Sequence, residues 1–316
     1  MYYLVYGLLF LVSLLPMRVL YGLADIIYVF VYYVFGYRKE VVMSNLGIVF
    51  PEKPIKDRVI IAKKFYQNFI DAFIESLKMI TASDSFLKKR FTANWSTIEE
   101  LYETGRSCQI HLGHTFNWEW GNYVLSLNTG YKVLVVYMPI RNVIFEKLFY
   151  KLRTRSGSAM LPATNMARAI VPYRNVQYLL GLVADQTPGN SENAYWLNFF
   201  GRPTPFVNGP EKGARAGNFP VVYAYIEKRK RGHYHAVVEV ATEEPNSLPE
   251  GELTRQYVKY LEGVIRKNPD MWLWTHRRWK KEWKEEFINL WIDTLPPPGG
   301  NILQELRSKN ITTTEL

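Results

Sequence analysis

The chain has 316 residues, a formal net charge of +10, and a composition that is 48% hydrophobic and 15% aromatic. This length suits one large α/β domain or two smaller ones, and the apolar content ensures a sizeable core. The positive charge predicts attraction to anionic partners, which include nucleic acid, anionic lipid headgroups and acidic carrier proteins. The single cysteine, Cys108, excludes an intramolecular disulfide and fits a reducing compartment. We expect Cys108 to be a buried packing residue and not a nucleophile.

The N-terminal segment is strongly apolar over 1–15 and again over 19–35, with interruptions at Pro16, Arg18 and Asp25. A membrane-spanning helix needs about 20 predominantly apolar residues, and no uninterrupted run here reaches that length comfortably. A cleaved signal peptide is disfavoured because the segment lacks a basic start and a cleavage site of small residues. A buried helix pair remains an alternative. The preferred prediction is a membrane anchor, either one tilted span or a helix pair in one leaflet.

Basic residues follow the apolar segment, beginning with Arg38 and Lys39 and continuing with Lys53, Lys56, Arg58, Lys63 and Lys64. By the positive-inside rule, this places the bulk of the protein on the cytoplasmic side of the membrane. Tyr32, Tyr33 and Tyr37 suit an interfacial aromatic belt. The same cations could instead form a solvated helix face.

The remaining chain alternates strand-like and helix-like segments. Apolar residues at helical spacing predict helices over 56–79, 118–127, 142–154, 166–173 and 253–265. Short apolar runs rich in β-formers predict strands over 107–112, 132–137, 178–184, 220–226 and 234–240. This alternation predicts an α/β fold with a central mixed or mostly parallel sheet flanked by helices. The expected division is a membrane anchor over 1–35, one catalytic domain over 36–295 and a polar C-terminal tail over 296–316.

The segment HLGHTFNWEW, residues 111–120, carries the chemistry. A strand ends near Gly113, His114 follows in the turn before a helix, and Glu119 comes five residues later. Polar groups at such junctions in α/β sheets commonly face the ligand crevice. Two residues five apart on one helix point about 140° apart, so the pair requires His114 in the turn and Glu119 in the first helical turn. A histidine backed by a carboxylate can deprotonate an alcohol near neutral pH.

A zinc site is the competing interpretation of the same segment, because His111 extends the pattern to H-x2-H-x4-E. His111 lies on a strand with its side chain directed to the opposite face from Leu112, and the pattern offers no obvious fourth ligand. The sequence therefore predicts no metal.

Residues 108–120 resemble the H-x4-D/E block of glycerolipid acyltransferases. The form GH-x-x-NWE resembles the late lipid A acyltransferases of Gram-negative bacteria, the lauroyl/myristoyl transferase family. Further segments are similar to blocks of that family in the same order: residues 137–157, 182–190 and 198–222, and the WTHRRWK run near the C-terminus. The apolar N-terminus also matches in position. Five ordered matches arise by chance far less readily than one.

The resemblance implies transfer of an acyl chain from acyl carrier protein to a hydroxyl of an acylated, phosphorylated glucosamine lipid. It implies no metal and no dissociable cofactor, with acyl carrier protein, the lipid acceptor and the membrane as partners. It places the enzyme at the inner membrane with the catalytic domain on the cytoplasmic face.

The resemblance also assigns roles to individual residues. His114 would be the general base, Glu119 its orienting partner, and Arg155 the stabiliser of the developing oxyanion. Substrate binding would fall to Asn117, Arg153 and Asp185. The arginines could alternatively contact phosphate or carrier protein, and Asp185 could cap a helix or turn. The aspartate block reads ADQTPG and lacks the second acid that some members carry, which weakens the assignment of Asp185.

Other functions stay open at this stage. One is acylation of a different lipid, such as a lysophospholipid or an amino-acid lipid. Another is a membrane-tethered lipid-binding protein that uses the same fold without catalysis. A nucleic-acid partner is not predicted, because only the net charge favours one. The run of aromatic and basic residues over 272–280 fits membrane-interface or core packing better than base stacking.

Overall fold

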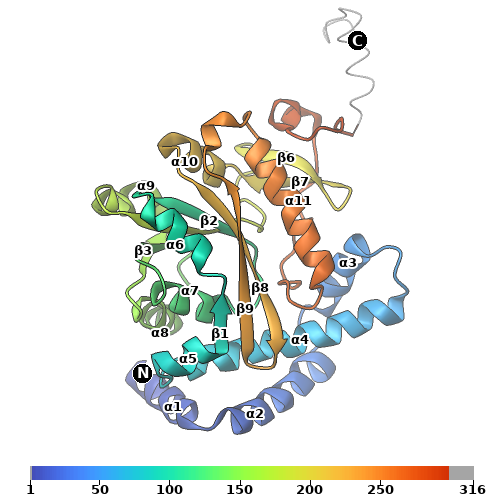
Figure 1. Cartoon of the computed structure of the whole chain (residues 1–316). Helices are drawn as coiled ribbons and strands as arrows, with labels where there is room; N and C mark the ends of the chain where they lie inside the picture. Colours follow the sequence, from blue (N-terminus) through green and yellow to red (C-terminus); the bar gives the residue numbers. More distant parts are fainter. Residues whose placement is uncertain (1, 299–316) are drawn as a thin grey trace, which may run out of the picture.

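The computed structural model describes residues 2–298 and shows a three-layer α/β arrangement around one large sheet (Figure 1). The sheet has seven strands in the order β1-β9-β8-β2-β5-β3-β4. Neighbouring strands run parallel except at the β8–β9 pair, which is antiparallel. The predicted mostly parallel sheet flanked by helices is therefore confirmed. The predicted tail over 296–316 lies almost wholly outside the described residues.

The middle strands of the sheet are the ones that carry apolar runs. They are β2 (Cys108–Leu112), β3 (Lys132–Tyr137), β5 (Tyr178–Val183), β8 (Val221–Lys230) and β9 (His233–Thr242), with short β1 (Phe91–Ala93) and β4 (Ala159–Pro162) at the two edges. Burial on both faces accounts for these runs, since helices cover both sides of a mostly parallel sheet. Cys108 is fully buried in this core, as predicted. Burial also raises the pKa of its thiol to about 12, so the group is unreactive.

Helices fill the layers on the two faces of the sheet. One face carries α6 (Ser96–Glu103), α7 (Trp118–Ser126) and α8 (Val143–Thr154), and the other carries α9 (Met166–Ala169), α10 (Gly209–Gly217) and α11 (Glu252–Lys267). Alternate residues of β2 show the division. Ile110 packs in the cluster with α6, while the His111 ring meets Tyr257 of α11. The helices predicted over 118–127, 142–154 and 253–265 are thus confirmed, and 166–173 forms only one short α-helix followed by a 3-10 turn.

The N-terminal third forms a helical layer at one end of the sheet, drawn in blue at the bottom of Figure 1. It comprises α1 (Tyr2–Leu14), α2 (Met17–Val29) continued by a π-helical turn over Phe30–Val34, α3 (Lys39–Val49), α4 (Ile55–Lys78) and α5 (Asp84–Arg90). The α2 segment Met17–Val34 is long and apolar enough to cross a membrane, although it packs along α4. Pro16 separates α1 from α2, because proline cannot continue the preceding helix.

A small hairpin lies apart from the main sheet and was not foreseen. It pairs β6 (Ala194–Phe199) with β7 (Arg202–Val207) through a two-residue turn at Phe200 and Gly201, both with positive φ. Two features hide it in the sequence. Phenylalanine is a rare choice where φ is positive, and Pro203 and Pro205 argue against a strand. The prolines are tolerated because β7 pairs only with β6 among the described residues.

Candidate active site

His114 lies in the loop that joins β2 to α7, and the segment 271–273 holds this loop through main-chain hydrogen bonds. The main-chain N–H of Leu273 donates to the carbonyl of His114, and that of Phe116 donates to the carbonyl of Met271. Helix α7 then begins at Trp118, which places Glu119 in its first turn. Both local positions agree with the sequence prediction.

The carboxylate that contacts the His114 ring belongs to Asp185. The Asp185 Oδ1 lies 2.5 Å from Nδ1 of His114, and its Oδ2 accepts from the His114 N–H at 2.8 Å and from the Trp272 indole at 2.6 Å. The contact follows from topology: β2 and β5 are parallel neighbours, so the loops after their carboxyl ends meet. Burial by itself raises the pKa of Asp185, but the contacts with His114 and Trp272 outweigh it and lower the pKa to about 2.

The second ring nitrogen of His114 faces the side-chain amide of Gln186. The Gln186 Nε2 lies 3.2 Å from the His114 Nε2. An amide NH2 can only donate, so this contact requires a lone pair on Nε2. The hydrogen bonds therefore assign the proton to Nδ1, facing Asp185, and leave Nε2 as the basic atom. About a fifth of the His114 side chain is exposed, so Nε2 is reachable.

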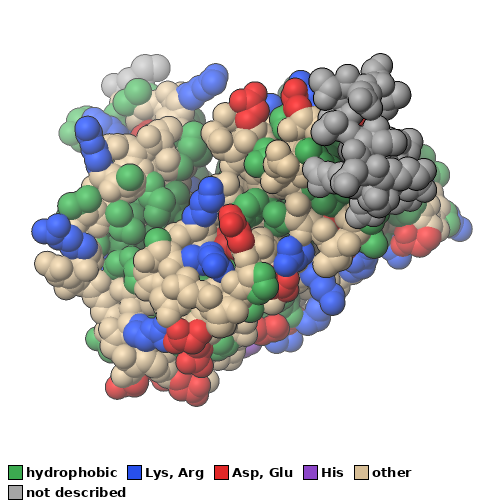
Figure 2. All heavy atoms as spheres, turned by 90° about the horizontal axis from the view of Figure 1, so that it is seen from above, with side chains coloured by type: hydrophobic (Ala, Val, Ile, Leu, Met, Phe, Trp, Pro, Cys, Tyr) green, Lys and Arg blue, Asp and Glu red, His purple; other side chains and the backbone are tan. Residues whose placement is uncertain are grey.

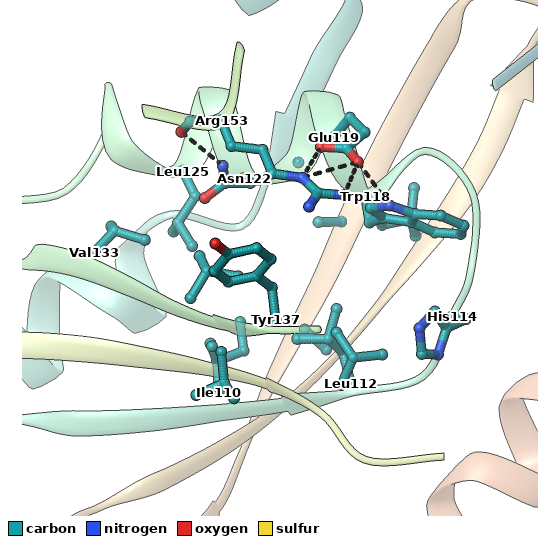
Figure 3. Close-up of a pocket in the computed structure, with 18 of the residues that line it drawn as sticks. Ile110, Leu112, His114, Trp118, Glu119, Asn122, Leu125, Val133, Tyr137 and Arg153 are labelled. Atoms are coloured by element: carbon teal, nitrogen blue, oxygen red, sulfur yellow. Dashed lines mark hydrogen bonds and ion pairs between the residues drawn. The ribbon is translucent and has the colours of Figure 1, made fainter. Parts of the chain in front are cut away.

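Glu119 pairs with Arg153 of α8 and not with His114. Its carboxylate accepts from Arg153 Nη2 at 2.6 Å and Nε at 3.0 Å, and from the Trp118 indole at 3.2 Å (Figure 3). The Trp118 ring in turn meets the His114 ring edge-on at 5.5 Å. Among the described residues, the direct His114–Glu119 contact expected from the sequence is not found. Asp185 contacts Nδ1, and Gln186 lies beside Nε2.

A cavity of about 390 Å³ opens beside His114, between the sheet and α7. Its polar wall lies at the carboxyl ends of the parallel strands and comprises His114, Glu119, Arg153, Tyr137 and Gln186. The remaining wall is mainly apolar and continues toward the start of the strands, with Ile110, Leu112, Leu125, Val133, Val135 and Val238 among its residues. Gly181 lies in the floor between Ile110 and Val135, its partners on the neighbouring strands. Such a cavity suits a ligand with a polar head and a hydrocarbon chain.

Two further predicted site residues lie away from this cavity. Arg155 donates to the main-chain carbonyls of Met79 and Ala82, just beyond α4, and is not among the residues that line the cavity. Asn117 is fully buried, and its side chain caps α7 by accepting from the N–H of Trp120. The structure thus brings His114, Glu119 and Arg153 to the cavity wall and holds Asn117 and Arg155 outside the lining. Asp185, predicted to bind substrate, is fully buried behind His114 and does not line the cavity either.

Sequence reasoning missed the local roles of Gln186, Trp118 and Trp272. Gln186 directly follows Asp185 in the ADQTPG block, so its position beside the histidine could have been inferred once Asp185 was placed there. Trp272 belongs to the aromatic and basic run that was interpreted as interface or core packing. It is fully buried, as core packing requires, but its indole also binds the Asp185 carboxylate.

Comparison with known proteins decides the family. Residues 1–281 match the family described as bacterial lipid A biosynthesis acyltransferase. The chain belongs to this family. It is 24% identical over 252 residues to the lipid A biosynthesis palmitoleoyltransferase of Escherichia coli (strain K12), a match that covers 77% of this chain and 79% of that protein. It is also 24% identical over 261 residues to the lipid A biosynthesis acyltransferase of Haemophilus influenzae, covering 80% of this chain and 81% of that protein.

Membership of the lipid A acyltransferase family makes this chain an acyltransferase of lipid A biosynthesis. The resemblance stated from the sequence is confirmed at the level of the family. Family membership does not specify the acyl donor, the position acylated on the acceptor or the roles of individual residues. These depend on the geometry of the site.

Two histidines behind the site, His111 fully buried and His276 partly buried, predict how stability depends on pH. Burial lowers the pKa of His111 to about 3, and burial followed by the charge of Arg278 lowers that of His276 to about 4. Between pH 6.5 and 4 the unfolded chain therefore binds protons that the folded chain does not. We expect His111 to lower the unfolding free energy as the pH falls through this window, by up to about 1.4 kcal/mol per pH unit. The partly exposed His276 contributes a smaller effect of the same sign, and Glu75, whose pKa burial raises to about 7, contributes one of the opposite sign. Urea unfolding between pH 7 and pH 5 measures this slope.

A His111→Gln variant keeps a polar side chain at this position without a group that titrates in the window. We expect it to show a clearly shallower slope than the wild-type chain over the same pH range. Equal slopes in the two proteins would show that His111 does not contribute to the acid sensitivity.

Proposed function

We propose that this protein transfers a fatty acyl chain from acyl carrier protein to a hydroxyl of a lipid A precursor, with His114 as the general base. The observation that carries the proposal is the reachable Nε2 of His114, backed on Nδ1 by the buried carboxylate of Asp185 at the mouth of an apolar cavity. No metal or dissociable cofactor takes part in the proposed reaction.

The reaction begins when the acceptor hydroxyl displaces the Gln186 amide and hydrogen-bonds to Nε2 of His114. Nε2 takes the hydroxyl proton while the oxygen forms a bond to the thioester carbonyl carbon. Asp185 stabilises the imidazolium that results and holds the ring in place. When the carbon–sulfur bond breaks, the imidazolium returns the proton to the thiolate of the carrier. The products are an ester and the carrier thiol, and His114 is again neutral.

Arg153 is the cation best placed to stabilise negative charge at the cavity mouth. Glu119 and the hydrogen bonds to Nε and Nη2 fix its guanidinium, while Nη1 makes no hydrogen bond within residues 2–298. That free N–H group can donate to the developing oxyanion or to a substrate phosphate. Arg155 is less suited to the oxyanion role predicted for it, since two main-chain carbonyls occupy its guanidinium. Glu119 then acts through Arg153 and Trp118 as a positioning residue.

Substitution of the two carboxylates separates their roles. We expect Asp185→Asn to lower kcat by about 100-fold or more, because the amide can present its NH2 group to Nδ1 and cannot stabilise the imidazolium. Glu119→Gln keeps an acceptor for Arg153 and should cost clearly less. His114→Ala should abolish turnover. A purified assay with acyl carrier protein thioester and a lipid A precursor measures all three. The assignment fails if Asp185→Asn keeps near wild-type kcat, or if Glu119→Gln is the more damaging change.

The apolar part of the cavity is the proposed seat of the acyl chain. A larger side chain at Gly181 would fill the cavity from its floor, since a Cβ there would make only ordinary contacts, with the Leu134 carbonyl, Val135 and Ile110. We expect Gly181→Leu to fill the cavity and to shift preference toward shorter donors by about 10-fold or more in relative kcat/KM. Competition between donors of different length, followed by mass spectrometry, measures the shift. Leu180→Met, on the opposite sheet face, is the matched control and should leave the preference unchanged.

We further propose that the protein lies on the cytoplasmic face of the inner membrane, with α1 and α2 along one leaflet. Both helices expose large apolar side chains, among them Tyr3, Leu4, Leu8, Leu11, Ile26 and Val29. Together α2, its π-helical turn and α4 border an apolar groove of about 480 Å³. By contrast, the opposite face, seen from above in Figure 2, carries both cationic and acidic side chains.

Polar contacts of α2 with the catalytic domain argue against a spanning orientation. Arg231, at the tip of the β8–β9 hairpin, lies 2.7 Å from both Asp25 of α2 and Asp71 of α4. A spanning α2 would hold this hairpin tip, with the exposed Arg229 and Lys230, inside the hydrocarbon layer. Each such charge costs about 3 kcal/mol or more at the bilayer centre. An in-plane helix pair avoids this cost and is typical of monotopic proteins.

Cysteine labelling tests the orientation. Arg18 and Arg38 lie near the two ends of the apolar α2 segment and are exposed, while the native Cys108 is buried. With protein bound to the outside of sealed vesicles, we expect a membrane-impermeant maleimide to label both Arg18→Cys and Arg38→Cys. Labelling of only one position before the vesicles are opened would establish a spanning helix instead.

A further inference from the structure

A second buried carboxylate lies close to segment 114–120, which carries His114 and Glu119, and has no role in the reaction described above. Glu75 is in the last turns of α4, is 0% exposed and does not line the cavity. A buried carboxylate is costly unless it is well hydrogen-bonded. Within residues 2–298, Glu75 forms no ion pair. Its bonding partners are neutral donors, and they come from three separate parts of the chain.

Two tyrosines bind Glu75 from opposite sides. Its Oε1 accepts from the Tyr21 hydroxyl of α2 at 2.7 Å, and its Oε2 accepts from the Tyr234 hydroxyl of β9, also at 2.7 Å. These bonds join the N-terminal helices and the β8–β9 hairpin at one carboxylate.

The third partner is the loop that carries His114. Asn117 donates from Nδ2 to the Glu75 Oε2 at 2.9 Å, and the Trp120 indole donates to the Glu75 main-chain carbonyl, also at 2.9 Å. Because Nδ2 of Asn117 is held by Glu75, its Oδ1 is directed to the N–H of Trp120 and caps α7. Glu75 thereby fixes the residue at which α7 starts, between His114 and Glu119.

We propose that Glu75 is a positioning residue that sets the geometry of segment 114–120 and links it to the N-terminal helix α2 through Tyr21. The inference rests on the proposed function for its effect on turnover. The same set of hydrogen bonds therefore holds α2 against the domain and holds segment 114–120 in its conformation. Substrate binding in the cavity does not involve Glu75 directly.

The surroundings of Glu75 also indicate which substitution is conservative. Burial raises the pKa of Glu75 to about 7, while the hydrogen bonds from Tyr234 and Tyr21 oppose the rise. A neutral amide of the same shape is therefore tolerated at this position better than at a fully ionised site. Its oxygen can still accept up to two hydrogen bonds, and its NH2 group can donate two.

A reciprocal exchange between positions 75 and 117 tests the link to the catalytic loop. Asn117→Asp keeps the helix cap but replaces the NH2 group that donates to Glu75 by an acceptor, and we expect kcat to fall by about 10-fold or more with little change in KM. Adding Glu75→Gln restores the hydrogen bond with donor and acceptor exchanged. We expect the double variant to recover to within about threefold of wild-type kcat. A double variant no more active than Asn117→Asp alone overturns the proposal.

The link to α2 has its own variant and a matched control. Tyr21→Phe removes only the hydroxyl that binds Glu75, and we expect kcat to fall severalfold while binding to anionic vesicles stays unchanged. Tyr28→Phe removes a hydroxyl two helical turns further along the same buried face of α2 and should leave kcat unchanged. Equal activity of Tyr21→Phe and Tyr28→Phe overturns the link to α2.

Amide hydrogen exchange separates this inference from the proposed function. In Asn117→Asp we expect faster exchange over residues 114–124 than in the wild-type chain, with recovery in the double variant, whatever reaction the protein catalyses. If His114→Ala abolishes acyl transfer but neither kcat nor exchange responds to the changes at positions 75 and 117, the positioning role is wrong and the proposed function stands. If the wild-type protein transfers no acyl group but exchange responds as expected, the positioning role stands and the proposed function is wrong.

Discussion

The site depends on the adjacency of two parallel strands. Because β2 and β5 are neighbours, the loops at their carboxyl ends bring His114 and Asp185 together although the two residues are 71 positions apart in the chain. One carboxylate then satisfies the histidine ring, the histidine main chain and the Trp272 indole. The orientation of the His114 ring is thus set by the topology of the sheet and by a tryptophan from the C-terminal region, and not by the local H-x4-E spacing alone.

The charged and basic side chains at the site form two separate pairs. Asp185 serves His114, and Glu119 serves Arg153, with the Trp118 ring between the two pairs. Each cationic or basic group has a buried carboxylate beside it, so no member of a pair is buried without a counter-charge. The separation lets His114 and Arg153 face the same cavity, each with a carboxylate of its own.

The sequence predicted the sheet, most of the helices and the position of His114 in the turn before α7, because these follow from apolar periodicity and from a local motif. It could not identify the partner of His114, since a contact between residues 114 and 185 depends on strand order, which periodicity does not contain. The hairpin at Phe200 and Gly201 was missed because its turn residues and prolines contradict the usual pattern. Asn117 and Arg155 were placed at the site by resemblance, but burial and main-chain bonds hold them behind it.

The contact between Gln186 and the basic nitrogen of His114 bears on a hazard that every acyl-transfer enzyme faces, which is loss of the activated donor to water. A lone pair already engaged by an amide cannot activate a passing solvent molecule until that amide moves. An alcohol that belongs to a large lipid makes other contacts with the protein, and these can offset the loss of the Gln186 hydrogen bond. A single water molecule makes no such contacts. The resting hydrogen bond would therefore favour transfer over wasteful hydrolysis before any substrate has bound.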